Sequence, residues 1–517
     1  MAAGTIVVMT SVARRFHDET THTPYSIRTS GHTLDWDNKP FPFKVYTDAP
    51  AIPLPRDIDV VATPTLEALA TPAPPAERLT LGALTALLYY TAGVTKKKTY
   101  PGGGEVLFRA AASTGALYQT EVYVVAGDVE GLAPGLYHFC PGDFTLRRLG
   151  EGDVRAALAE AAAEPALAGR AAMFVVSGIY WRNTWKYQAR GYRHLFWDSG
   201  TMLANALAVG DALGLAPRLA VGFVDAAVNR LVGLDPQREA ALEVLALGPE
   251  KAPAPPTDVR PPLAHDVMPL SATEVDYPAL RELHAASGLT SAEEVRAWRA
   301  RPAPPAREPH GAVVRLPAPP DGGLPLGEAI QRRGSTRRFG PAPLAAGELA
   351  AALRAATRPI PADVPSGLVD LSVIVNAVEG LAPGAYAYWP GRGLELVRAG
   401  EFRREAAYLT LEQPLGGDAA ATIFFLAPLD AILAAWGERG YRLANLEAGL
   451  AGGRAYLAAY ASGFGASGLT FYDAEVVRFF SPHATGRDAI FVTALGRAGG
   501  PPGSVLVSNV ISPPRRS

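Results

Sequence analysis

The sequence predicts an α+β protein made of two tandem copies of one fold, which form a pseudo-dimer within a single chain. Three observations lead to this prediction: an internal repeat, a mixed helix and strand pattern in each copy, and a proline-rich bridge between the copies. Residues 129–135 recur unchanged as residues 378–384, at an offset of 249. An identical segment at such a distance indicates two homologous domains rather than a short-period repeat array.

The repeat continues in register over more than 100 residues. The further matches are Tyr137 with Tyr386, Tyr192-Arg193 with Tyr441-Arg442, Gly200 with Gly449, and Asp225 with Asp473. The offset is 249 as far as Gly449 and 248 from Asp473 onward, so one residue is missing from the second copy between these positions.

Each copy mixes segments of helical and of strand character. Apolar residues at helical spacing favour helices, and short apolar runs rich in β-branched residues favour buried strands. The predicted helices cover residues 79–92, 196–213, 344–357 and 445–462, and the predicted strands cover residues 122–126, 173–178 and 242–247. Helices that cover a sheet in each copy make an α+β arrangement.

Five segments are expected along the chain. They are a leader (1–78), domain 1 (79–250), a proline-rich linker with a short helix at 291–300 (251–325), domain 2 (326–500) and a C-terminal tail (501–517). Proline fixes φ and removes a hydrogen-bond donor, so the linker is expected to run extended over a surface. The leader is expected to wrap around the pseudo-dimer, with Trp36, Phe41 and Phe43 packed against it.

Composition excludes several classes of function. The 48 basic and 50 acidic residues give a net charge of −2, which is unlike a nucleic-acid binder. No apolar run is long enough for a membrane helix, and the short apolar run at 5–9 precedes Arg14-Arg15, the wrong order for a signal peptide, so a cytoplasmic protein is expected. Cys140, the single cysteine, is expected to be a small core residue. The spacing of His17 and His22 matches no zinc pattern, so no metal is expected.

An arginine-rich segment follows a predicted short helix at 326–331. It places Arg333, Ser335 and Arg337 at alternate positions. Guanidinium groups match the oxygens of a phosphate, and a serine hydroxyl adds a donor, so the segment suits a phosphate ligand. The alternative interpretation is a solvated basic turn. Another basic run, Lys96-Lys97-Lys98, is expected to be a solvated loop, with a phosphate- or substrate-binding role as its alternative.

The Arg-x-Ser-x-Arg-x-Phe pattern at 333–339 resembles the FMN-phosphate motif of the nitroreductase superfamily. Residues 109–115 are similar to that superfamily's Arg-x-x-Pro-Ser-x-Gly loop, with Ala112 in place of proline. The resemblance implies two tandem nitroreductase-like domains and an FMN site at their interface. The residues that would bind FMN are Arg333, Ser335, Arg337 and Arg497 at the phosphate, Ser113, Thr114 and Gly115 across the interface, and Ser467, Gly468 and Leu469 beside the ring.

A second resemblance concerns the branch of the superfamily. The paired segments at 129–135 and 378–384 and the run at 225–234 are similar to SagB/ThcOx-type dehydrogenases, which oxidise azolines to azoles in ribosomal peptides. In that branch a Lys-Tyr pair acts in catalysis, which implies Lys186 as base and Tyr187 as its assistant. Flavin-driven desaturation needs a base, and a desolvated lysine near Arg182 and Arg190 has a lowered pKa. The alternative interpretation is a basic and aromatic surface stretch.

The two copies have diverged in a complementary way. The second keeps the phosphate motif, whereas the first keeps the loop at 113–115, of which 365–367 is the nearest remnant in the second copy. The second copy also has no Lys-Tyr pair in the corresponding segment, which includes residues 436–442. We therefore expect one complete FMN site per chain and one dismantled site.

Three functions remain open from the sequence. The favoured one is FMN-dependent oxidation of an organic substrate, azoline to azole, with O2 reoxidising the flavin. The others are an NAD(P)H-dependent nitro or quinone reductase and a flavin-free pseudoenzyme that serves as a scaffold. A small-molecule or peptide substrate is expected, with room for a biosynthetic partner enzyme and with no nucleic-acid or membrane partner. A pseudo-dimer within the chain is consistent with a monomer.

Overall fold

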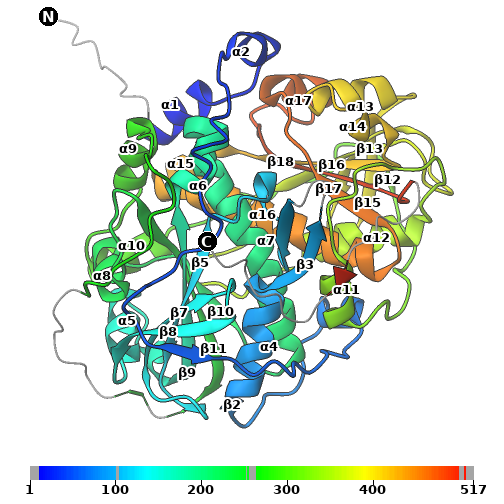
Figure 1. Cartoon of the computed structure of the whole chain (residues 1–517). Helices are drawn as coiled ribbons and strands as arrows, with labels where there is room; N and C mark the ends of the chain where they lie inside the picture. Colours follow the sequence, from blue (N-terminus) through cyan, green and yellow to red (C-terminus); the bar gives the residue numbers. More distant parts are fainter. Residues whose placement is uncertain (1–10, 100–103, 252, 255–262, 500–505, 508–517) are drawn as a thin grey trace, which may run out of the picture.

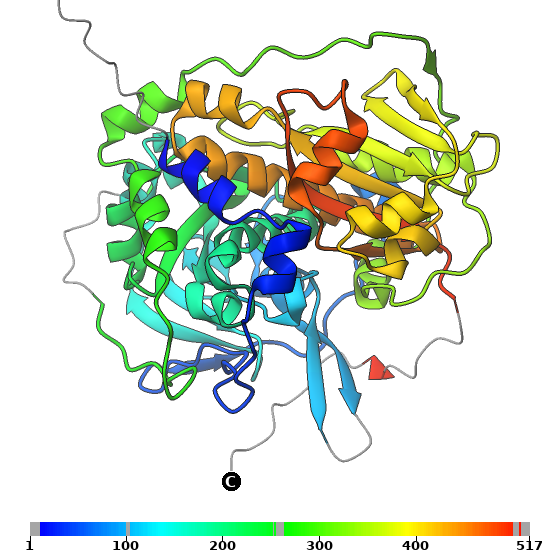
Figure 2. The same ribbon diagram turned by 90° about the horizontal axis from the view of Figure 1, so that it is seen from above.

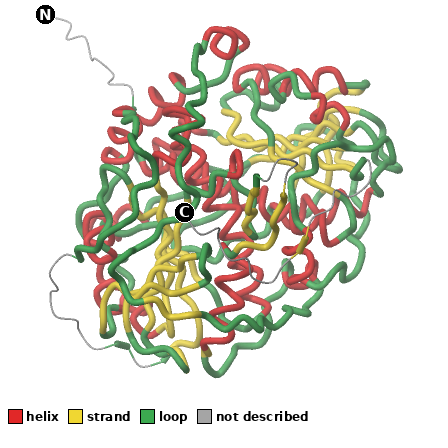
Figure 3. The backbone as a smooth tube through the Cα atoms, viewed as in Figure 1, coloured by secondary structure: helices red, strands yellow, loops and turns green. Residues whose placement is uncertain are grey.

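Two seven-stranded sheets flank a central pair of long helices, α7 (Gly191–Ala212) and α16 (Arg439–Ala461) (Figures 1 and 3). The computed structural model describes residues 11–99, 104–251, 253–254, 263–499 and 506–507. The expected tail at 501–517 and the apolar run at 5–9 lie almost wholly outside these residues. The sheet orders are β1-β8-β7-β5-β9-β11-β10 and β12-β15-β14-β13-β16-β18-β17. The same architecture occurs twice, which confirms the tandem α+β prediction.

The leader and domain 1 supply the first sheet. The leader contains α1 (Val12–Glu19), α2 (Pro24–Thr29), β1 (Ala51–Pro53) and α3 (Thr65–Ala68). Domain 1 contains β2 (Leu79–Thr80), α4 (Leu81–Ala92), β3 (Val94–Thr99), β4 (Glu105–Arg109), η1 (Thr114–Ala116), β5 (Thr120–Ala126), β6 (Val129–Glu130), β7 (Gly135–Cys140), β8 (Thr145–Glu151), α5 (Arg155–Ala161), η2 (Pro165–Gly169), β9 (Arg170–Ile179), α6 (Tyr180–Tyr187), η3 (Gln188–Arg190), α7, β10 (Arg218–Ala220), α8 (Asp225–Val232) and β11 (Glu239–Glu250).

The linker and domain 2 supply the second sheet. The linker contains α9 (Pro278–Ala286), α10 (Ala292–Arg299) and β12 (Val313–Val314). Domain 2 contains α11 (Leu326–Arg332), α12 (Ala346–Ala356), β13 (Asp370–Val375), β14 (Gly384–Trp389), β15 (Gly393–Ala399), α13 (Arg403–Leu409), α14 (Pro414–Asp418), β16 (Ala421–Ala427), α15 (Leu429–Trp436), α16, β17 (Gly465–Gly468), α17 (Asp473–Phe480) and β18 (Asp488–Gly496), and β19 (Leu506–Val507) follows.

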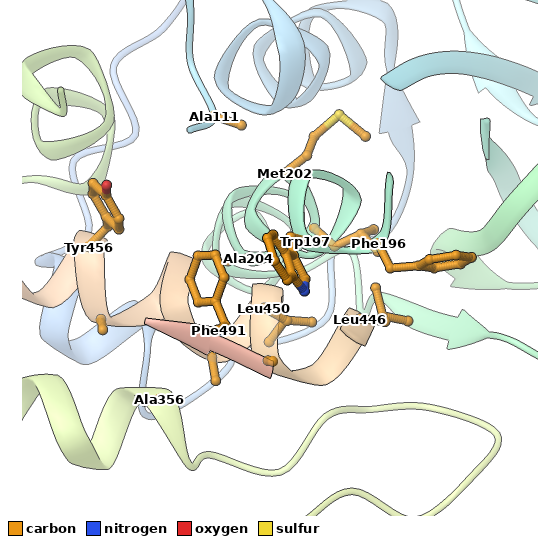
Figure 4. Packing of buried hydrophobic residues seen from close by; sticks show 14 of the residues in the cluster. Ala111, Phe196, Trp197, Met202, Ala204, Ala356, Leu446, Leu450, Tyr456 and Phe491 are labelled. Atoms are coloured by element: carbon orange, nitrogen blue, oxygen red, sulfur yellow. The ribbon is translucent and has the colours of Figure 1, made fainter. Parts of the chain in front are cut away.

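Helices α7 and α16 cross at two glycines that the repeat had matched. A Cβ atom on Gly200 would lie 2.5 Å from the backbone nitrogen of Leu450, and one on Gly449 would lie 2.4 Å from the carbonyl oxygen of Trp197. Glycine is therefore required at both positions by close backbone approach. Around the crossing, apolar side chains from both helices, among them Trp197 and Leu450, fill the interface between the copies (Figure 4).

Reciprocal buried ion pairs also join the copies. Arg193 of domain 1 contacts Asp473 of domain 2 at 2.7 Å, and Arg442 of domain 2 contacts Asp225 of domain 1 at 2.7 Å. Burial alone raises the pKa of Asp473, but Arg190 and Arg193 outweigh it and lower the pKa to about 2. The repeated Arg and Asp positions are thus the two halves of one pseudo-symmetric interface.

A β-hairpin distinguishes the two copies. Leu79 pairs with Val129 in domain 1, and Leu344 pairs with Val378 in domain 2. The offset between Leu79 and Leu344 is 265 rather than 249, so domain 1 has 16 additional residues between this pairing and the repeat. Strands β3 and β4 account for these residues, and they project from the body of the molecule in Figure 2.

The leader contacts both domains. Its strand β1 pairs with β8, and in α1 the backbone N–H of Ala13 donates to Glu438 Oε2 at 2.7 Å. Phe43 is buried, as expected, with an exposed fraction of 3%. Trp36 is 65% exposed, so the expectation that it packs down is wrong. It stands at a tight turn and meets Trp185 only edge-on, at a centroid distance of 5.3 Å.

Burial and helix length bear on two further expectations. Cys140 is buried, and burial raises the pKa of its thiol to about 12, as fits a core residue rather than a nucleophile. Among the helices that the structure describes, none is both long and apolar enough to cross a membrane.

Candidate functional site

The arginine-rich segment lies beside β17 in domain 2. The backbone N–H of Thr336 donates to the carbonyl oxygen of Ala466 at 2.9 Å, which fixes the segment along the strand. The hydroxyl of Ser335 lies 3.3 Å from that of Tyr456, which in turn accepts a hydrogen bond from the N–H of Gly468. Ser335 and Gly468, predicted from separate motifs, therefore share one partner.

Arg333 reaches across the domain interface. Its buried guanidinium donates from Nε to the carbonyl oxygen of Ala110 at 2.8 Å and from Nη2 to that of Arg109 at 3.0 Å. Both acceptors belong to the loop that leads to Ser113. The structure thus brings the predicted phosphate motif of domain 2 to the loop of domain 1, as the interface interpretation requires.

Lys96 joins this cluster from β3. Its Nζ donates to the carbonyl oxygens of Arg332, at 2.6 Å, and of Arg333. Burial, with the positive charge of Arg333, lowers the pKa of Lys96 to about 7. The expectation of a solvated loop is wrong for this lysine, because antiparallel pairing with β4 lifts it over the arginine-rich segment. Lys97, next along the strand, forms an ion pair with Glu105 instead.

The loop at 113–115 is fixed by hydrogen bonds to the carboxylate of Asp198 in α7. The hydroxyls of Ser113 and Thr114 both donate to its carboxylate, Thr114 at 2.7 Å, and the N–H of Thr114 adds a bond of 3.0 Å. Both predicted side chains therefore turn toward α7, and the loop presents backbone to the interface. Burial raises the pKa of Asp198 to about 6.

Asp198 was missed in the sequence, although the repeat carried a signal. Its equivalent at the 249-residue offset is Glu447, whose carboxylate accepts hydrogen bonds from the N–H groups of Gly367 and Leu368 at 3.0 and 2.7 Å. A carboxylate at this position of each long helix therefore holds the loop of its own copy.

Gly115 meets the predicted catalytic pair. It has φ of +64°, and a Cβ atom there would lie 3.0 Å from the hydroxyl oxygen of Tyr187. The ring of Tyr187 meets His194 edge-on at 4.5 Å, and Nζ of Lys186 lies 5.4 Å from the centre of the Tyr187 ring. The end of α6 and the loop of domain 1 therefore form one surface.

The electrostatic surroundings of Lys186 favour its neutral form. Burial lowers the pKa of Lys186, and the positive charges of Arg337 and Lys39 lower it further. These neighbours differ from the expected ones, since Arg182 pairs with Glu121 and Arg190 with Asp473. Burial also raises the pKa of Tyr187, which stays protonated and can donate. The charge of Arg337 therefore acts on both residues of the predicted catalytic pair.

The remaining predicted residues lie on or after β17. The hydroxyl of Ser467 is buried and has no hydrogen-bond partner among the residues that the structure describes. Gly468 is exposed, and the N–H of Leu469 donates to Val492 at 3.3 Å. Arg497 differs from Arg333, because its Nη2 donates to Glu348 at 2.7 Å, so its charge is already balanced within domain 2.

These residues fit an anionic, aromatic cofactor. Lys96 and Arg333 lie together, and the hydrogen bonds described for them go to backbone carbonyl oxygens rather than to carboxylates. Two desolvated cations in this setting suit an anion such as a phosphate, which would balance both charges. The unpartnered hydroxyl of Ser467 and the open side of Gly468 offer a polar edge for a planar ring.

The pseudo-symmetric position on the other side of the molecule is closed by backbone pairing. Leu219 of β10 is equivalent to Gly468, because each faces the matching residue of the adjacent strand (Leu245 and Thr493). The N–H of Leu219 donates to the carbonyl oxygen of Pro361 at 2.8 Å, and its own carbonyl oxygen accepts from Asp363 at 3.0 Å. The loop of domain 2 thus pairs directly with the strand and leaves no room between them.

Side chains complete this closure. The carboxylate of Asp363 accepts from the N–H groups of Val221 and Gly222 at 2.9 and 3.1 Å, and it pairs with Arg299 of α10. Trp298 of the same linker helix covers Gly222, whose Cβ atom would lie 2.9 Å from the indole, and donates to the carbonyl oxygen of Trp436 at 2.9 Å. The linker therefore fills the counterpart of the candidate site.

A cavity of about 320 Å³ lies beside α6, between Trp181 and α9. Its charged side chains pair with one another, Arg238 with Glu274 and Arg281 with Asp276. None of the predicted cofactor-binding or catalytic residues lines it. The cavity is therefore separate from the predicted site at the domain interface.

Comparison with known proteins identifies the class. Two regions of the chain, residues 70–248 and 330–483, match the Nitroreductase family, and the chain belongs to this family of oxidoreductases. A crystal structure of a "putative nitroreductase" from Anabaena variabilis is 29% identical, with a TM-score of 0.75 over 94% of this chain and 99% of that one. The tandem arrangement is therefore shared along almost the whole length of that protein.

Two curated relatives match shorter stretches of the chain and are named as processing proteins. The microcin B17-processing protein McbC of Escherichia coli is 30% identical over 168 residues, and the trifolitoxin-processing protein TfxB of Rhizobium leguminosarum bv. trifolii is 28% identical over 181 residues. These matches cover 29% and 34% of this chain. The chain spans about half the length of each, 54% of McbC and 48% of TfxB.

Proposed function

We propose that this protein is an FMN-dependent dehydrogenase with one FMN site per chain, formed between the two domains. The observation that carries the proposal is the contrast between the two pseudo-symmetric positions. One gathers Arg333, Ser335 and the buried hydroxyl of Ser467, which has no hydrogen-bond partner within the described part of the chain, whereas the other is filled by Asp363 and Trp298. A tandem chain of this family would then bind one flavin and not two.

The roles of the residues follow from their positions. Arg333 and Ser335 would hold the phosphate, and Ser467-Gly468-Leu469 would border the ring. Ser113 and Thr114 would act through the loop that Asp198 holds, with Gly115 allowing close approach of the backbone. Arg497 would contribute to the phosphate site only after exchanging its bond to Glu348 for the ligand. Bound FMN supplies a two-electron acceptor.

Lys186 would serve as the base. Removal of a hydride from a substrate carbon leaves a proton to be taken from the adjacent atom, and neutral Nζ of Lys186 can accept it. Burial and the charges of Arg337 and Lys39 lower the pKa of Lys186, which increases the neutral fraction at a given pH. Tyr187, packed on Gly115, would hydrogen-bond the substrate from its protonated hydroxyl. Arg337, the last arginine of the phosphate motif, would therefore also tune the pKa of the base.

The proposed substrate is an azoline in a ribosomal peptide or related natural product. Support comes from the similarity to McbC and TfxB, two peptide-processing proteins, and from the Lys-Tyr pair at the end of α6. The azoline loses two electrons and two protons in forming the azole, and O2 would take the electrons from reduced flavin. A peptide-modifying partner enzyme and a cytoplasmic location belong to the same proposal.

A single anaerobic experiment tests the reaction. The purified holoprotein is mixed without O2 with a peptide that carries a thiazoline, and the visible absorbance of oxidised flavin is followed. The proposal predicts bleaching, together with loss of two hydrogens from the peptide by mass spectrometry. Bleaching by NADPH with an unchanged peptide would support a reductase instead, and a protein purified without flavin that binds none on addition would support a scaffold.

A further inference from the structure

The β3–β4 hairpin brings domain 1 onto the phosphate motif of domain 2. The hairpin belongs to the 16 residues that domain 1 has and domain 2 lacks, so it serves one interface position only. In Figure 1 β3 lies beside α7 near the centre of the view, and in Figure 2 the hairpin projects from the body of the molecule. A structural element present in one copy alone is a natural source of asymmetry between the two sites.

Within the hairpin, Lys96 is the residue that touches the motif. Its Nζ donates to the carbonyl oxygens of Arg332 and Arg333 and lies 3.6 Å from where a Cβ atom of Gly334 would stand. The hydroxyl of Tyr460 in α16 lies 3.7 Å from the same point. The ammonium group is therefore held over the turn between Arg333 and Ser335.

Among the residues that the structure describes, no carboxylate pairs with the charge of Lys96. Its described partners are two carbonyl oxygens, and the neighbouring charge that acts on it is the like charge of Arg333. Burying two adjacent cations is unfavourable, and an anion that contacts both removes the penalty. Lys97 differs in this respect, because its charge is balanced by an ion pair with Glu105.

We propose that Lys96 binds the phosphate of FMN from across the domain interface and so completes the phosphate site that Arg333 and Ser335 begin. This inference rests on the proposed function. It assigns to the hairpin the task of tying the two domains together through the cofactor. Because the hairpin is missing from domain 2, it also accounts for part of the difference between the two interface positions.

The test compares FMN with riboflavin, which has the same ring and no phosphate. Apoprotein is titrated with each flavin, and binding is measured by the change in flavin fluorescence. Lys96→Met is expected to weaken FMN binding about 10- to 100-fold, the range for one hydrogen bond to a charged group, and to leave riboflavin binding unchanged. Lys96→Arg should recover most of the affinity for FMN.

Lys97→Met is the matched control, since Lys97 stands on the same strand with its side chain on the opposite face. It should change neither affinity. Equal weakening of both flavins by Lys96→Met, or no change for FMN, would overturn the role of Lys96, and thermal unfolding of each variant shows whether the fold is retained. If the unaltered protein binds neither flavin, the proposed function fails and this inference falls with it.

Discussion

The two interface positions of this chain have the same scaffold and opposite contents. At one, Gly468 of β17 is exposed and the opposing loop is held back by Asp198, which leaves a surface lined by cations. At the other, Leu219 takes the place of Gly468 and pairs directly with the loop at 361–363. Two copies of a fold within one chain can change independently of each other. In a homodimer every substitution would appear in both sites.

Residues that hold the copies together have not diverged in this way. The ion pairs Arg193–Asp473 and Arg442–Asp225 are reciprocal. At the helix crossing, each long helix contributes one glycine, Gly200 or Gly449, that packs on the backbone of the other helix. Removing one partner from a buried pair leaves an uncompensated charge, and a Cβ atom at the crossing would meet backbone. Substitutions are therefore constrained in both halves of the interface scaffold. Only one of the two interface positions is under the further constraint of keeping a binding site.

The largest effect is expected at Lys186. Lys186→Ala should lower turnover about 10²- to 10⁴-fold, the usual contribution of a general base, because the proton then has no acceptor. Flavin should remain bound, since the phosphate site is untouched. The measurement is steady-state turnover together with the flavin absorbance of the purified variant. Lys251→Ala, which removes a surface lysine paired with Asp128, is the control. Unchanged turnover in Lys186→Ala would refute the base.

The second effect tests the closed position. Trp298 is 2% exposed, so Trp298→Ala should lower the free energy of unfolding by about 3–5 kcal/mol through the cavity it leaves. Flavin content should stay at one per chain, because the backbone pairing of Leu219 still closes the position. Chemical denaturation and flavin absorbance measure both. Trp36→Ala, at an exposed site, should cost far less. A second equivalent of flavin in Trp298→Ala would show that the tryptophan alone blocks binding.

A third prediction concerns the end of α6. Gln188 has φ of +50° and ψ of −146°, a conformation that favours glycine, and its equivalent is Gly437 with φ of +61° and ψ of −158°. Gln188→Gly should stabilise the fold by about 1 kcal/mol, and Gly437→Gln should destabilise it by about 1–3 kcal/mol. Thermal and chemical unfolding of the two variants measure this. Opposite signs would mean that the side chain of Gln188 makes contacts that outweigh the strain.

The smallest effect is a shift in pH dependence. Because the positive charge of Lys39 lowers the pKa of Lys186, Lys39→Gln should raise it. The base acts when neutral, so activity rises with pH through this pKa, and the rising limb of the profile should move to higher pH by less than about one unit. Lys251→Gln, far from the pair, should leave the profile in place. A shift to lower pH would contradict the assignment of Lys186 as the base.

Much of the fold was predictable because the repeat reports it directly. Residues 129–135 and 378–384 predicted two domains, and the long helices were placed by apolar spacing, although α7 and α16 begin earlier than expected. Motif spacing also led to Arg333 and Ser335. Such local patterns depend only on which side chains of a single strand or helix are buried or exposed, and this spacing is similar in both copies.

The rest depended on contacts between distant segments. Lys96 belongs to a basic run that we expected to be solvated. Pairing of β3 with β4 instead places its Nζ at the arginine-rich segment, where it donates to the carbonyl oxygen of Arg332. Ser113 and Thr114 fit the motif, but only the packing of α7 shows that their hydroxyls turn to Asp198. The linker helix looked like a connector, and its Trp298 fills a site that belongs to two other segments. The spacing of residues along the sequence does not reveal such tertiary contacts.

We propose that this chain has one complete flavin site, and that side chains and backbone of the protein itself fill the second, pseudo-symmetric position. The most direct measurement is the molar ratio of flavin to protein in the fully reconstituted, purified protein, from flavin absorbance and amino-acid analysis after denaturation. We expect one FMN per chain, and nearly none in Arg333→Ala. Two FMN per chain, or one that persists in Arg333→Ala, would contradict this proposal.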